Sequence, residues 1–211
     1  MTPGAILAEG LAELGLDLGA DTQQRLLAYL SLLGRWNRTY NLTSVRAETA
    51  IVSAHLLDSL SLLPHLGPLA SLADIGSGAG LPGIPLAMAR PGMAVRLIES
   101  THKKTGFLTQ AKIDLGLANV SIHCDRAEDL AESMDWQPVE AAVSRAFGDL
   151  ASFVRVGAGL LAPGGKLFAM KGAHPAAEIA ALPAGWAVRR CLPLKVPGLM
   201  AQRHLIIIER V

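Results

Sequence analysis

Residues 72–87 read LADIGSGAGLPGIPLA, and this stretch decides the fold. A short apolar run that carries Asp74 leads into three glycines at alternate positions, Gly76, Gly78 and Gly80, and then into an apolar segment of helical character. Glycines allow positive φ and a close approach of ligand to backbone, and a helix N-terminus offers free N–H groups. A strand that enters a helix through such a turn is typical of a nucleotide-binding α/β fold.

The spacing of this turn also indicates which kind of nucleotide it binds. The dinucleotide motif G-x-G-x-x-G needs Gly or Ala at position 81, which is Leu81 here. The acid two residues before Gly76 suits a ligand that carries an amine and a nucleoside but no pyrophosphate. S-adenosylmethionine is such a ligand, and its cationic groups would be attracted to Asp74 at short range. The alternative is a glycine-rich turn without a ligand, but three alternating glycines lower local stability and need a reason.

The composition restricts which classes of protein this sequence can belong to. The chain has 211 residues, 51% hydrophobic and 18% charged, which is enough for one sizeable core. No uncharged apolar run approaches the roughly 20 residues of a membrane span, and the N-terminus lacks the basic region of a signal peptide, so we expect a cytoplasmic protein with no membrane partner. Cys124 and Cys191 stand singly in apolar stretches and are expected to be buried thiols. The histidines show no metal-ligand spacing, so no metal site is predicted.

The distribution of charge is more informative than its total. A formal net charge of +1 argues against a protein that coats nucleic acid indiscriminately. Among the charged side chains of residues 163–205, however, all are basic except Glu178. Residues 101–112 contain lysines and no acid. Such patches fit either a specific polyanionic partner or solvated strand ends, and charge alone does not choose between them.

The hydrophobic pattern changes near residue 70. Before it, apolar residues recur at helical spacing, which predicts a helical cap over residues 1–70. After it, short apolar strands alternate with helical segments, which predicts a doubly wound, mostly parallel sheet over residues 71–211 with helices on both faces. The expected strands are 72–75, 95–99, 120–124, 141–144 and 166–170, and the expected helices between or after them are 82–89, 103–115, 128–133, 151–161 and 176–182. The last two strands, 187–194 and 204–209, have no helix between them and predict an antiparallel pair at the C-terminal edge.

In open α/β sheets ligands bind at the carboxyl ends of the strands, so the residues at these ends are the candidates for chemistry. The second strand ends at Glu99, which follows Asp74 by roughly the interval, about 20 residues, at which an acid binds ribose hydroxyls. After the third strand, Asp125 and Glu128 either read the adenine edge or cap the next helix. The fourth strand ends at Arg145, which either fixes a carboxylate or phosphate or is structural.

Two absences narrow the chemistry. The Pro-Pro turn of enzymes that methylate exocyclic amines is replaced by Ser-Arg-Ala-Phe at residues 144–147. Neither Cys124 nor Cys191 stands where enzymes that make 5-methylpyrimidines carry their nucleophile.

With these residues assembled, the sequence resembles the ribosomal RNA small subunit methyltransferase G family, also called glucose-inhibited division protein B, over nearly the whole chain. The Trp-Asn-x-x-x-Asn-Leu-Thr block and Leu-Pro-Gly-Ile-Pro are far more specific than the glycines alone. The matching blocks are 36–43, 55–60, 74–85, 103–104, 126–128, 144–146, 170–172 and 203–206.

The resemblance implies a Rossmann-like class I methyltransferase that transfers a methyl group from S-adenosylmethionine to N7 of a guanosine in 16S rRNA and leaves S-adenosylhomocysteine. The expected partner is 16S rRNA or a small-subunit particle. The candidate cofactor contacts are Asp74, Gly76, Gly78, Gly80, Leu81, Glu99, Ala127, Glu128 and Arg145. The candidate RNA contacts are Arg38, Asn41, Lys103, Lys104, Lys171 and Arg203, and the candidates for positioning the guanine are Arg145, Lys103 and Lys171.

The chemistry of guanine N7 agrees with the absences. N7 has a free lone pair and no proton to lose, so attack on a sulfonium methyl needs neither a covalent cysteine nor a strong base, and no catalytic group is named. Trp36 and Tyr40 either stack on a base or belong to the core.

Two other classes of protein remain as alternatives. A dinucleotide-dependent oxidoreductase is disfavoured by Leu81, and an RNA-binding scaffold without catalysis is disfavoured by the intact glycine turn and Glu99.

Overall fold

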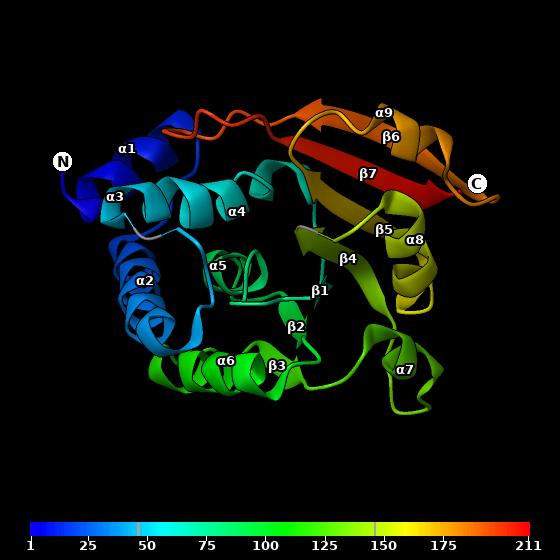
Figure 1. Cartoon of the computed structure of the whole chain (residues 1–211), viewed down its shortest axis with the longest axis horizontal. Coiled ribbons are helices and arrows are strands. Elements are labelled where there is room, and N and C mark those ends of the chain that lie inside the picture. The colour runs from blue at the N-terminus through cyan, green and yellow to red at the C-terminus, as the bar shows by residue number, and fades with distance from the viewer. Residues whose placement is uncertain (46, 146) are drawn as a thin grey trace.

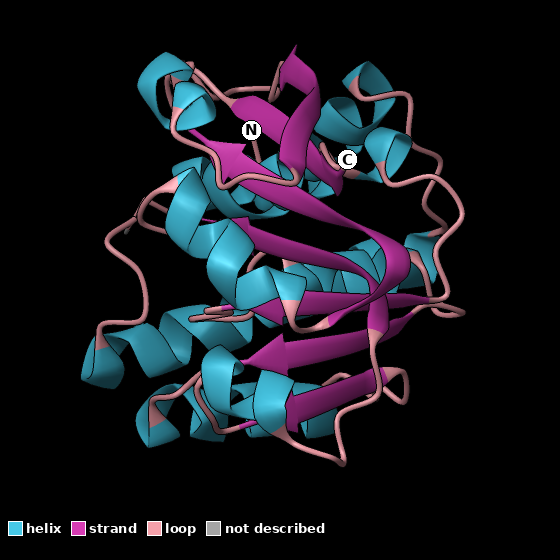
Figure 2. Ribbon diagram, turned by 90° about the vertical axis from the view of Figure 1, so that its right-hand side faces the viewer, coloured by secondary structure: helices cyan, strands magenta, loops and turns pink. Residues whose placement is uncertain are grey.

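The computed structural model describes residues 1–45, 47–145 and 147–211, so Arg46 and Ala146, the last residue of the 144–146 block, lie outside the described part. A seven-stranded sheet in the order β3-β2-β1-β4-β5-β7-β6 forms the centre of the molecule, with helices on both sides (Figures 1 and 2). The strands are β1 (Ser71–Ile75), β2 (Ala94–Ile98), β3 (Val120–His123), β4 (Val139–Arg145), β5 (Leu161–Lys171), β6 (Trp186–Pro193) and β7 (His204–Arg210).

The strands and helices predicted after residue 70 are all present with shifted ends; the largest shift is in β5, which begins at Leu161, where the end of a helix was predicted, and not at 166. The helices of this part are α5 (Gly83–Ala89), α6 (His102–Asp114), α7 (Ala127–Glu132), α8 (Leu150–Ala158) and α9 (Ala176–Ala180). Neighbouring strands from β3 to β5 are parallel, and β7 is antiparallel to both β5 and β6. The antiparallel C-terminal pair is confirmed, and the structure adds its order: the last strand, β7, lies between β5 and β6, and β6 forms the edge.

Alternation of side chains along the strands separates two hydrophobic layers. In β1, Leu72 faces one cluster, which also contains the apolar side chains of α5 and α6, whereas Ala73 and Ile75 face a second cluster built with α8. Because the central strands β1 and β4 are buried on both faces, the sheet needs helices on both sides. Strands β2 and β3 continue from β1 in one direction and β4 and β5 in the other, so the reversal of winding lies between β1 and β4.

The residues before β1 pack on the face of α5 and α6 (Figure 1). Leucines at helical spacing in the first two helices, Leu7, Leu11, Leu26 and Leu33, are buried there because one stripe of each helix is apolar. The predicted division near residue 70 stays a prediction. The elements are α1 (Pro3–Glu13), α2 (Ala20–Tyr40), α3 (Glu48–Ile51), a π-helical turn η1 (Val52–Leu57), α4 (Asp58–Leu60) and a 3-10 turn η2 (Leu63–His65).

Two findings concern the whole chain. Among the described helices none is both long and apolar enough to span a bilayer. The prediction that both cysteines are buried is wrong: Cys124 and Cys191 are half-buried free thiols. Cys124 directly follows β3 and Cys191 lies on β6, and these two strands form the edges of the sheet, where covering elements are sparse.

Candidate active site

The glycine-rich turn after β1 has the backbone that its sequence predicts. Gly76, Gly78 and Gly80 adopt positive φ values of 69°, 58° and 83°, a region that side chains other than glycine rarely adopt. The turn is tied to β2, because the N–H groups of Gly76 and Ser77 donate to the Ile98 carbonyl at 2.9 and 3.0 Å. A Cβ at Gly76 would meet nothing within 4 Å, so the turn is open to a ligand there, whereas at Gly80 it would lie 2.4 Å from Ile84 Cδ1.

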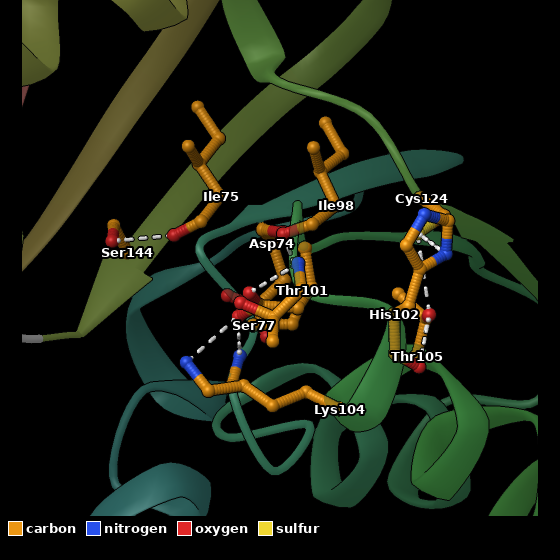
Figure 3. A network of polar contacts seen from close by, with 12 residues as sticks. Asp74, Ile75, Ser77, Ile98, Thr101, His102, Lys104, Thr105, Cys124 and Ser144 are labelled. Carbon is orange, nitrogen blue, oxygen red and sulfur yellow. Dashed lines mark hydrogen bonds and ion pairs between the residues drawn. The ribbon is translucent and has the colours of Figure 1, made fainter.

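Glu99, directly after β2, is fixed beside this turn. Its Oε2 accepts the Gly78 N–H at 3.0 Å, and its Oε1 accepts the Thr101 N–H at 3.0 Å. Lys104 on α6 brings Nζ to 3.4 Å from Oε2, and Figure 3 shows Lys104 and Thr101 beside Ser77 of the turn. Burial opposes the charge of Glu99, but the bonds from Thr101, the lysine and Gly78 outweigh it and lower the pKa of the carboxyl below its ordinary value. Glu99 is therefore an ionised acceptor at neutral pH.

Asp74 is fully buried beneath the turn. Its Oδ2 accepts the Gly83 N–H at the start of α5 at 2.8 Å, but within the described residues its Oδ1 has no hydrogen-bond partner. Burial raises the pKa of this carboxyl to about 7, although the Gly83 bond and the charge of Arg145 act in the opposite direction. An unpartnered buried acceptor of this kind is a position where a cationic group would be stabilised.

A first cleft opens at the ends of β1, β2 and β3 and contains about 500 Å³ of empty space, part of it continuous with solvent. Four predicted cofactor residues line it: Gly76, Glu99, Ala127 and Glu128. Leu81 does not line it, because its side chain is only 4% exposed and packs in the hydrophobic core.

A second cleft lies where β4 and β5 end beneath the cap and contains about 1010 Å³ of empty space, part of it continuous with solvent. Its polar lining includes His55 and Asp58 from the cap and three predicted residues, Arg145, Lys171 and Arg203. The structure thus brings Arg145 together with RNA candidates rather than with the lining of the first cleft. The two clefts adjoin at the end of β4, since Phe147 lines the first one.

The cations of the second cleft are held by specific partners. Asp58, fully buried, receives Arg145 Nη1 on Oδ2 at 3.1 Å and Arg203 Nε on Oδ1 at 2.9 Å. Lys171 Nζ lies 2.8 Å from Glu178 Oε2 and donates to the Gly148 carbonyl at 2.7 Å. The arginines therefore belong to one cluster and the lysine to another.

The other RNA candidates lie apart from this cleft, around the junction of α2 and α6. Arg38 and Asn41 are exposed near the end of α2, where Asn41 adopts a φ of 50°. Lys103 brings Nζ to 4.8 Å from the centre of the exposed Tyr40 ring. Trp36 is half-buried and packs edge-on against Phe107, with ring centres 5.6 Å apart. Trp36 is thus largely a packing residue, whereas the exposed Tyr40 ring contacts Trp36, with ring centres 5.1 Å apart, and Lys103.

Sequence reasoning gave no role to three cap residues that contact the site. Tyr29, wholly buried on α2, donates its hydroxyl to the carbonyl of Ala79 in the glycine turn at 2.6 Å. Burial raises the pKa of this phenol above its ordinary value, so it stays a donor. Asp58 and His55 lie in a largely apolar helical segment. An acid on a buried helical face is unusual, and this feature of the sequence could have indicated a role for Asp58.

His55 fixes the loop that forms one wall of the second cleft. Its Nε2 lies 2.8 Å from Thr43 Oγ1, and the Thr43 hydroxyl in turn accepts the Val45 N–H at 3.2 Å. The Thr43 N–H donates to Asn37 Oδ1 at 2.9 Å. Burial lowers the pKa of His55 below its ordinary value, so the imidazole is neutral at physiological pH. Among the described residues no group of His, Cys, Asp and Glu is placed to hold a metal ion.

Comparison with known proteins identifies the family. The model of the family described as rRNA small subunit methyltransferase G matches residues 22–206. The chain belongs to this family. It is 53% identical to the ribosomal RNA small subunit methyltransferase G of Aromatoleum aromaticum over 98% of each chain, and 50% identical to that of Chromobacterium violaceum over 96% of this chain and 95% of the relative.

Solved structures of more distant proteins share the fold. The O-methyltransferase TomG from Streptomyces achromogenes superposes with a TM-score of 0.60 at 16% identity, over 87% of this chain and 89% of that one. TrmN from Thermus thermophilus gives 0.57 at 20% identity, over 83% of this chain and 53% of that one. The Rossmann-like methyltransferase fold predicted from the sequence is therefore confirmed.

Proposed function

We propose that this protein transfers the methyl group of S-adenosylmethionine to N7 of a guanosine in 16S rRNA. The observation that carries the proposal is the pair of adjoining clefts at the end of β4, one beside the glycine turn and Glu99 and the other lined by Arg145, Lys171 and Arg203. The first has the chemistry of a nucleoside site, and the second the charge of a site for a polyanion.

The residues of the first cleft fit S-adenosylmethionine, which when bound supplies an electrophilic methyl group on its sulfonium. The open backbone at Gly76 lets a nucleoside approach, and Glu99 retains free lone pairs for the ribose hydroxyls. The segment around Ala127 and Glu128 is placed for the adenine edge. The unpartnered Oδ1 of Asp74 suits the cationic end of the same molecule. Of the predicted contacts, Leu81 has no support from this cleft, because it does not line it and its side chain packs in the core.

The residues of the second cleft act on the RNA by binding and orientation. Guanine N7 carries a lone pair and no proton, so no base has to act before methyl transfer. Holding N7 in line with the methyl group and sulfur can contribute roughly 7–11 kcal/mol through proximity alone. Arg145, Lys171 and Arg203 supply the positive charge for the RNA backbone, and Lys103, Lys104, Arg38 and Asn41 would extend the contact along the cap. We further propose that the acceptor is 16S rRNA, free or within a small-subunit particle, and that the protein acts in the cytoplasm.

The decisive experiment maps modified nucleotides in rRNA from cells with and without the gene. We expect one 7-methylguanosine in 16S rRNA that disappears with the gene and returns when purified protein and S-adenosylmethionine are added. Gly76→Asp should abolish this activity and calorimetric binding of S-adenosylmethionine, because it places a carboxylate in the open part of the turn. Gly15→Asp is the matched control, since Gly15 also has positive φ and open surroundings but lies outside the site. An unchanged methylation map, or binding of a nicotinamide dinucleotide instead, would contradict the proposal.

A further inference from the structure

We propose that Asp58 is a positioning residue for RNA binding, which holds Arg145 and Arg203 as the two arms of a clamp for one phosphodiester of the substrate strand. The inference rests on the proposed function and deepens it. Its starting point is an acid that is wholly buried at the base of a cleft yet has a cation on each of its two oxygens.

The three groups come from distant parts of the chain. Asp58 opens α4 in the cap, Arg145 ends β4, and Arg203 immediately precedes β7. Arg145 is further fixed by the Ala54 carbonyl, which accepts from Nη1 at 3.0 Å, and Arg203 Nη1 donates to the Gln202 carbonyl at 2.9 Å. The carboxylate therefore sets the distance and angle between two guanidiniums that no backbone element places side by side.

Burial of the acid argues that this geometry is required by function. A buried ion pair rarely stabilises a protein more than apolar side chains of the same volume would, so stability alone gives weak grounds for Asp58 at this place. The two arginines are also not buried with it: their side chains are 23% and 25% exposed and line the second cleft. Because the carboxylate is buried and the two guanidiniums are exposed to the cleft, the arrangement favours a ligand of negative charge.

The arginines retain the donors that such a ligand needs. A guanidinium has five N–H groups, and within residues 1–45, 47–145 and 147–211 neither Nη2 of Arg145 nor Nη2 of Arg203 donates a hydrogen bond. Two cations around one anion leave a net charge of +1 in the cluster. A phosphodiester carries one negative charge and two non-bridging oxygens, and arginine is the side chain best suited to such oxygens. The neighbouring Lys171 is paired with Glu178 and not with Asp58, so it is not an arm of this clamp.

The test uses Asp58→Asn in the full-length protein, with rRNA and small-subunit particles from cells that lack the gene as methyl acceptors. If Asp58 contributed only negative charge, its removal would strengthen RNA binding. The clamp predicts the opposite: the KM for the acceptor rises by about tenfold or more, the effect of one lost charged hydrogen bond. The Kd of S-adenosylmethionine stays within about twofold. Over roughly 50–200 mM salt, the dependence of acceptor binding on salt becomes shallower by about 0.7 in logarithmic slope.

Glu209→Gln is the matched control. Glu209 also bridges two cations, Lys166 at 2.9 Å and Arg189 at 3.1 Å, but it lies on β7 and lines neither of the two clefts. For the Glu209→Gln variant we expect the KM for the acceptor and the salt dependence of acceptor binding to stay at the wild-type values, although this substitution changes the net charge by the same amount as Asp58→Asn.

A second variant covers the case in which Asp58→Asn does not fold. Asp58→Asn combined with Arg203→Gln removes one cation with the anion, so we expect the melting temperature to return toward the wild type while the KM for RNA stays raised. The inference is overturned if either variant binds RNA as well as the wild type, or if the Kd of S-adenosylmethionine rises as much as the KM for RNA. An inactive wild-type protein would instead refute the proposed function, so the two failures are distinguishable.

Discussion

Replacement of Asp74 by asparagine tests the buried acid beneath the glycine turn. Asn has the shape of Asp, so its side-chain oxygen can still accept the Gly83 N–H that now binds Oδ2 at 2.8 Å. Its amide N–H₂ would occupy the place of Oδ1, which has no partner within the described residues. The protonated acid likewise places an unpaired O–H there. The substitution therefore removes the charge of Asp74 and little else.

The magnitude follows from the pKa of the carboxyl. Burial raises it from an ordinary 3.8 to about 7 in the folded protein. Because the folded pKa lies above the unfolded one, the contribution of Asp74 to stability is fully present below pH 4 and is lost as pH rises through 7. At roughly 1.4 kcal/mol per pH unit the total loss is about 4 kcal/mol, of which about 3 kcal/mol falls between pH 5 and 8. The Asn variant lacks this loss.

The assay is urea unfolding of both proteins without cofactor at pH 5, 6, 7 and 8. We expect the Asn variant to gain about 3 kcal/mol relative to the wild type across this range. In calorimetry, cofactor binding to the wild type should release a proton and strengthen as pH rises toward 7, because a cation beside Oδ1 favours the ionised acid. The variant should bind more weakly and without this pH dependence. A stability difference that does not change with pH would refute the reasoning.

Three further predictions concern the surroundings of the turn. Tyr29→Phe leaves the Ala79 carbonyl unpaired, so we expect a loss of about 1–3 kcal/mol in unfolding free energy and weaker cofactor binding by calorimetry. Gly80→Ala should lower the melting temperature more than Gly15→Ala, because both have positive φ but only at Gly80 would the new Cβ meet another side chain at 2.4 Å; equal effects would contradict the packing argument. Glu99→Gln removes an ionised acceptor and should weaken cofactor binding by about tenfold with little change in the KM for RNA, measured by calorimetry and initial rates.

Local pattern was sufficient to predict most of the fold. The glycines at 76, 78 and 80 must adopt positive φ, and the alternation of Leu72, Ala73 and Ile75 between two apolar layers requires helices on both faces. The order of the last strands was beyond such reasoning. An antiparallel pair without a helix can add to a sheet with either member inside, and the choice depends on which strand pairs with β5.

The site was predicted less completely, for a reason that Arg145 illustrates. Its position at the end of β4 predicts a residue at the mouth of the ligand site, but chain position does not give the direction of a long side chain. That direction is set by Asp58, which lies 87 residues earlier in the sequence. Tyr29 shows the same limit, since its partner in the glycine turn is 50 residues away. Interactions over such separations are a property of packing between the cap and the sheet.

These two contacts also explain why the cap is part of the site. Tyr29 of the cap holds the turn that lies beside Glu99, and Asp58 of the cap holds the arginines of the second cleft. A displacement of the cap would therefore disturb both clefts together, whereas a change in the sheet near Glu99 would disturb only the first. Under the proposed function the first cleft binds a small cationic nucleoside and the second a large anion, so a cap that contacts both sets the distance between the two ligands. That distance is what a methyl transfer without a chemical catalyst depends on.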